Sequence, residues 1–75
     1  MISPGLFRHY KGGHYRVLFI AKDSNNAGND GNVVVYVSLG EPGRISVRNE
    51  AEFDEDVETF EGDIVTVKRF TRIGD

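Results

Sequence analysis

Short apolar runs separated by turn-forming residues make up this chain, and no run has the length and period of a packed helix. The runs are rich in β-branched and aromatic residues, which favour strands. Gly, Asn, Asp and Pro collect between the runs and are typical of turns. A parallel strand pair needs a long crossover, usually a helix, between its strands. The pattern therefore predicts an all-β protein with a mostly antiparallel sheet.

Five or six strands are expected, with tight turns at residues 12–13 and 62–63. Asn49 is placed to cap one short helical turn, and the tail at residues 71–75 is expected to fray. Closing this strongly bent sheet into a small barrel would remove exposed strand edges. The expected strands cover residues 6–10, 14–22, 32–39, 45–48, 57–60 and 64–70.

The expected core consists of the apolar residues of these strands and of the helical turn. The run at residues 32–39 is nearly continuous, which is typical of a strand buried on both faces. Phe60 is expected to be a core anchor, and the polar stretch at residues 23–31 to be a mobile loop. The residues expected to be mostly buried are Val17, Phe19, Val33, Val35, Val37, Val47, Phe53 and Val65.

The 75 residues suffice for one domain, spanning residues 1–75, with too little volume for a deep cavity beside a core. A homodimer would relieve that limit, so the oligomeric state stays open. The chain has no cysteine, which excludes disulfides, thiolate chemistry and Cys-based zinc sites and suits a reducing cytoplasm. The longest apolar stretch, residues 17–21, is too short to span a bilayer, and the start lacks the pattern of a signal peptide. We therefore expect a cytoplasmic protein without a membrane partner.

Charge is segregated along the chain. Residues 1–22 carry four basic residues and no acid, whereas residues 49–63 carry eight acids and no base. The simplest interpretation is that the two regions fold against each other and partly neutralise, or remain solvated. The alternative is that the acidic segment is a surface for a protein partner.

The opening hairpin is the candidate binding site. If residues 12–13 form a two-residue turn, Lys11 lies opposite His14. His9 then lies opposite Arg16, and all four side chains share one face. A cationic face beside tyrosines could hold a phosphate, a nucleotide or a nucleic-acid backbone. The candidate ligand-binding residues are Arg8, His9, Tyr10, Lys11, His14, Tyr15 and Arg16.

Two other interpretations of the hairpin stay open. Its polar residues could simply face solvent. If His9 and Arg16 point to opposite faces, the convergent site does not exist. A protein–protein adaptor or homodimer that uses the acidic segment 49–63 and the sheet edges is then favoured.

The sequence offers no constellation typical of catalysis. His9 and His14 lack a third metal ligand at diagnostic spacing. The acids of residues 50–63 form an exposed run. A catalytic pair of carboxylates needs burial or a cleft to give its two members different pKa values, and this run offers neither. No serine lies in an elbow motif, and residues 11–13 lack the spacing of a phosphate-binding loop. We therefore expect a binding module, not an enzyme, with no metal, no cofactor and no catalytic residue.

Three blocks of residues resemble a known family. The first is Gly-Leu-Phe-Arg-His-Tyr-Lys-Gly-Gly at residues 5–13, followed by Tyr15, Val17 and Leu18. The others are Val34-Val35-Tyr36 with Val47-Arg48 and Phe53, and the pair Arg69-Phe70. Together they resemble the bacterial domain-of-unknown-function family 1653, which usually has proline where Asn49 stands here. The resemblance implies an SH3-like small barrel and no established activity.

Overall fold

The computed structural model describes residues 2–24 and 31–75. These residues form an all-β protein with seven strands and one short helix. None of the described segments is a helix long and apolar enough to cross a membrane. In chain order the elements are β1 (Gly5–His9), β2 (His14–Lys22), β3 (Asn32–Ser38), β4 (Ile45–Asn49), α1 (Glu50–Phe53), β5 (Asp56–Glu61), β6 (Asp63–Lys68) and β7 (Phe70–Gly74).

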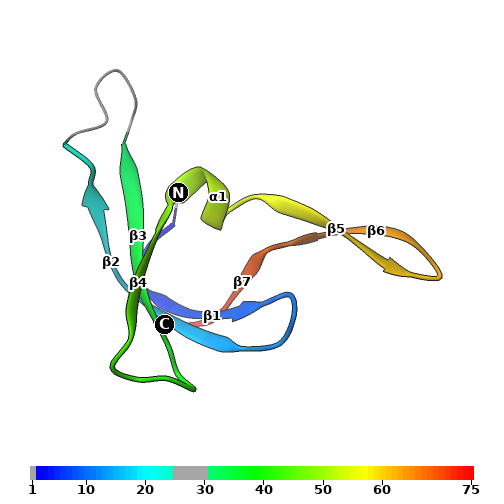
Figure 1. Ribbon diagram of the computed structural model, residues 1–75, viewed down its shortest axis with the longest axis horizontal. Helices are drawn as coiled ribbons and strands as arrows, with labels where there is room; N and C mark the ends of the chain where they lie inside the picture. The colour runs from blue at the N-terminus through cyan, green and yellow to red at the C-terminus, as the bar shows by residue number, and fades with distance from the viewer. Residues whose placement is uncertain (1, 25–30) are drawn as a thin grey trace.

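The strands form two separate antiparallel sheets (Figure 1). Five strands lie in the order β4-β3-β2-β1-β7, whereas β5 and β6 pair with each other. We call this second hairpin, residues 56–68, the arm. Figure 1 shows that it projects from the sheet on the side away from β2, β3 and β4. The molecule is consequently elongated, with extents of 43 × 30 × 19 Å.

One face of the five-stranded sheet, here called the inner face, carries an aromatic core. Phe53 of α1 stacks on Phe70 of β7 with ring centroids 4.0 Å apart. Phe7 meets the Phe53 ring edge-to-face at 5.3 Å, and Tyr36 does so at 5.5 Å. Such aromatic pairs stabilise the fold by more than the burial of their apolar area alone would. The core therefore joins residues from β1, β3, α1 and β7.

The short helix begins where the sequence predicts. Asn49 Oδ1 accepts a hydrogen bond from the Ala51 amide at 2.8 Å, which caps α1. The Glu50 carboxylate accepts hydrogen bonds from the Ile2 amide at 3.0 Å and from Asn32 Nδ2 at 3.4 Å. These bonds tie α1 to the start of the chain and to β3, so that Phe53 is held over the inner face.

The turns agree in part with the sequence prediction. Gly62 closes the arm with a φ of +89°, a conformation that favours glycine. The chain also turns after β3, where the Glu41 amide donates to the Ser38 carbonyl oxygen at 3.2 Å. The expected mobile loop falls mostly on residues 25–30, which lie outside the described residues.

Closure into a barrel is not confirmed, because the five-stranded sheet remains open at β4 and β7. Closure would require β4 and β7 to pair with each other or through a further strand. Among the described strands β5 pairs only with β6, from Asp56 opposite Lys68 to Glu61 opposite Asp63, so that it does not bridge the two edges.

The tail was expected to fray, and this prediction is wrong. Residues 70–74 form β7, which pairs with β1. Arg72 fixes this strand, because its guanidinium donates to the carbonyl oxygens of Ser3 and Pro4 at 2.7 and 3.2 Å. The guanidinium also lies over the Phe7 ring, 4.8 Å from its centroid. Side chains distant in sequence thus anchor the C-terminal strand.

The predicted core is right in part. Val17, Val35 and Phe53 are buried, and Val33 and Val37 are half-buried. The predicted burial of Phe19, Val47 and Val65 and the predicted anchoring role of Phe60 are wrong, because all four are exposed.

A β-bulge explains the exposure of Phe19. Val17 lies opposite Tyr36 on the inner face, and simple alternation would place Phe19 there too. The pairing shifts between these two residues, so that Phe19 lies opposite Val35 on the other face. We call that face of the sheet the outer face.

Candidate functional site

The turn of the opening hairpin is wider than the sequence predicts. β1 ends at His9 and β2 begins at His14, so residues 10–13 connect them. The Nδ1 atom of His9 accepts a hydrogen bond from the Lys11 amide at 3.1 Å. Gly12 has a φ of +118°, which suits glycine. The histidine side chain thus helps to build a four-residue turn in place of the expected two-residue turn.

This turn divides the predicted site between two faces. Arg16 lies opposite Leu6, not His9, a shift of three residues. An odd shift moves one strand's side chains to the other face. Arg8, His14 and Arg16 therefore lie on the outer face, and His9 belongs to the inner face with Tyr15. The predicted convergence of His9 with Arg16 is wrong, and ligand binding by these residues stays a prediction.

His9 packs at the edge of the aromatic core. Its ring meets Phe70 edge-to-face at 4.9 Å. Burial lowers the pKa of the imidazole, and the positive charges of Arg69, Arg48 and Lys11 lower it further. The neutral form is therefore favoured, which agrees with Nδ1 acting as an acceptor.

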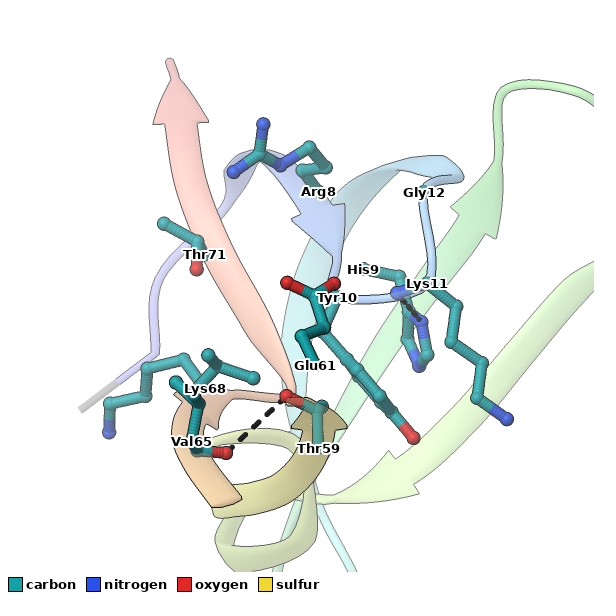
Figure 2. Close-up of a pocket in the computed structure, with 11 residues that line it drawn as sticks. Arg8, His9, Tyr10, Lys11, Gly12, Thr59, Glu61, Val65, Lys68 and Thr71 are labelled. Atoms are coloured by element: carbon teal, nitrogen blue, oxygen red, sulfur yellow. Dashed lines mark hydrogen bonds between the residues drawn. The ribbon is translucent and has the colours of Figure 1, made fainter. Parts of the chain in front are cut away.

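An open groove lies between the turn of the opening hairpin and the arm (Figure 2). Its volume is about 510 Å³. Four of the predicted ligand-binding residues line it, namely Arg8, His9, Tyr10 and Lys11. His14, Tyr15 and Arg16 are not among its lining residues. The arm contributes the opposite wall with Thr59, Glu61, Val65, Val67 and Lys68.

The arm residues of the groove were missed by sequence reasoning. Lys68 is held by two acids, with Nζ 3.3 Å from Asp54 Oδ1 and 3.7 Å from Asp56 Oδ1. Arg8 and Lys11 make no ion pair within residues 2–24 and 31–75. Their charge remains available to a ligand in the groove. Nothing in the local sequence indicates that the arm folds toward residues 8–12.

The acidic side chains of residues 49–63 form ion pairs with basic residues other than those expected. Its ion-pair partners are Arg48, Lys68 and Arg69, which pair with Glu52, with Asp54 and Asp56, and with Glu55 respectively. No ion pair in the described part of the chain joins residues 1–22 to residues 49–63. Partial neutralisation at longer range, as by Glu61 across the groove from Arg8 and Lys11, stays a prediction.

A row of apolar side chains crosses the outer face. Phe19, Val35 and Val47 lie opposite one another on β2, β3 and β4, and we call them the apolar row. Phe19 is 54% exposed and Val47 is 64% exposed, so that only their neighbour Val35 is covered. Val35 is buried outside the aromatic core. Sequence reasoning missed this surface because it assigned all three residues to the core.

The described residues contain no group of three or more His, Asp or Glu side chains arranged to hold a metal ion.

Comparison with known proteins identifies the family. The model of the family described as a protein of unknown function, DUF1653, matches residues 5–72. The chain belongs to the DUF1653 family. A crystal structure of a DUF1653 protein from Bordetella bronchiseptica is 35% identical and superposes with a TM-score of 0.78. The match covers 97% of this chain and 88% of that chain. Among curated proteins no relative matches.

Proposed function

We propose that this protein is a non-catalytic binding module that recognises a protein partner through the outer face of its sheet. The observation that carries the proposal is the uncovered apolar row, in which Phe19 and Val47 are more than half exposed. Contiguous exposed apolar surface is typical of protein–protein contact sites. Such a row is costly in water, because Phe19 and Val47 keep more than half of their area solvated.

The neighbourhood of the row supports this proposal. β4 is an edge strand of the sheet, so its outer backbone groups have no partner strand. Ile45, on the same strand and face as Val47, is 63% exposed. The row is thus continued to a strand edge, where a partner could bind by backbone pairing as well as by apolar contact.

Replacing Val47 with lysine is expected to abolish partner binding while leaving the fold intact. The new charge would lie in the centre of the contact and would be desolvated by any apolar partner. Because Val47 is exposed, the change should alter the free energy of unfolding by less than about 0.5 kcal/mol. The measurement is quantitative mass spectrometry of proteins held from a cell extract by immobilised wild-type and variant protein.

Glu41→Lys is the matched control, because Glu41 lies in an exposed turn outside the apolar row. Proteins held by the wild type and by Glu41→Lys, but lost with Val47→Lys, would support the proposal. It would be contradicted if every protein held by the wild type were held equally by Val47→Lys.

The groove supports a second candidate function, recognition of an anionic ligand such as a nucleotide or a nucleic-acid backbone. Arg8 and Lys11 both line the groove, and neither forms an ion pair among the described residues. Tyr10 lies between them in sequence and offers a ring for stacking. Glu61 on the opposite wall weakens the positive potential, which is why this function comes second.

For the second candidate, we expect pyrophosphate to raise the pKa of His9. In the free protein His9 should titrate below its ordinary value of 6.5, because of burial and the nearby cations. An anion in the groove would favour the protonated imidazole, so binding should also tighten as the pH falls. The measurement is an NMR titration of the His9 ring with and without pyrophosphate, with Arg8→Ala as the variant in which the shift shrinks. Identical midpoints with and without pyrophosphate would exclude contact between His9 and the anion.

A further inference from the structure

The arm has an apolar side that nothing in the described chain covers. Phe60 and Ile64 lie opposite each other next to the Gly62 turn and are 77% and 61% exposed. Side chains alternate along a strand, so this pair points to the side opposite Thr59, Glu61 and Val65, which line the groove. A two-stranded hairpin without a covering layer is marginally stable in water. The arm therefore needs a partner surface.

We propose that the arm of one copy lies across the outer face of a second copy, and that the exchange is reciprocal. This inference rests on the proposed function and identifies its partner as the chain itself. Within one chain the two apolar surfaces are far apart, because the arm projects away from β3 and β4 (Figure 1). Each copy carries one arm and one apolar row, so a second copy provides a row for the first arm and an arm for the first row. A two-fold pair would bury both arms and both apolar rows.

The charges of the two surfaces match this arrangement. On the arm, Glu58 lies on the same side of the hairpin as Phe60 and two residues farther from the Gly62 turn. Arg16 lies on the outer face, as the apolar row does. It is opposite Val37, which is two residues from Val35 on β3. Alternate residues on a strand are about 7 Å apart on both surfaces. With Phe60 against the apolar row, Glu58 can therefore reach Arg16 of the other copy.

Neither of these charges has an ion-pair partner in the part of the chain that the structure describes. Glu58 and Arg16 are both exposed. The acidic arm and the basic outer face are thus complementary in sign as well as in apolar pattern. Charge complementarity of this kind fixes the register of an interface and disfavours wrong partners.

A charge exchange tests the inference. Sedimentation velocity over a concentration series should show a dimer for the wild type. Glu58→Arg alone brings two positive charges together, and Arg16→Glu alone brings two negative charges together. Each single variant should raise the dimer dissociation constant by at least about tenfold. An equimolar mixture of the two variants should restore a dimer, because each arm then meets a face of opposite charge.

Glu61→Arg is the matched control, because it makes the same change on the other side of the arm and should leave the dimer intact. Circular dichroism spectra should confirm that every variant is folded. A wild type that stays monomeric at all concentrations would overturn the inference and leave the proposed function with a different protein partner. A dimer that resists both single variants, or a mixture that fails to associate, would also overturn it. Val47→Lys should also weaken the dimer, because Val47 belongs to the apolar row that the arm covers. A monomeric wild type whose partners are lost with Val47→Lys would support the proposed function and overturn the further inference.

Discussion

Replacing Phe53 with alanine is expected to unfold most of the protein at room temperature. Phe53 is fully buried, stacks on Phe70 and contacts the rings of Phe7 and Tyr36. Truncation of a buried phenylalanine costs about 3–5 kcal/mol, from lost burial and from the cavity that remains. A single core in a chain of this size supplies only about 3–5 kcal/mol of net stability. The free energy of unfolding, measured by urea denaturation, should therefore fall to near zero.

Phe60→Ala is the matched control for this prediction. It makes the same chemical change at a side chain that is 77% exposed. In protein dilute enough to exclude contact between copies, its unfolding free energy should differ from wild type by less than about 0.5 kcal/mol. Equal losses for the two variants would contradict the assignment of Phe53 as the residue that joins α1 to the sheet.

The sequence predicts six of the seven strands, because their apolar and β-branched runs are local features, whereas β7 was missed because its residues were expected to fray. The helix cap at Asn49 and the turn at Gly62 were also predicted, since each depends on one residue with a specific preference. Burial was harder to predict, because it depends on which face of a strand is covered. The bulge between Val17 and Phe19 reverses that face within one strand, and no residue type at this point marks it.

The candidate site was predicted less well than the strands, for a related reason. The basic residues of the hairpin were found, but their convergence depended on the length of one turn. Two glycines permit a two-residue turn, yet the hydrogen bond from the Lys11 amide to His9 stabilises a longer one. A shift of three residues was enough to send His9 and Arg16 to opposite faces. The apolar row and the arm wall of the groove depend on long-range pairing, which the sequence does not show.

Replacing Gly5 with alanine is expected to detach β7 from β1. Gly5 has a φ of +152° and is buried beside the C-terminal strand. A Cβ at this position would lie 2.8 Å from the carbonyl oxygen of Gly74 and would also collide with the Arg72 guanidinium. The backbone oxygen cannot move without displacing β7, and the guanidinium is the group that holds Ser3. The strain and the lost contacts should lower the free energy of unfolding by about 2–3 kcal/mol.

Gly43→Ala separates this effect from the general consequence of removing a glycine. No atom lies within 4 Å of a Cβ at Gly43, so we expect little change in stability there. Hydrogen exchange followed by NMR locates the damage in Gly5→Ala. The amides of residues 70–74 should lose protection first, because they depend on pairing with β1, whereas the amides that join β2 to β3 should stay protected. Uniform loss of protection over all five strands would instead mean that β7 is not a separable edge and that the whole sheet unfolds as one unit.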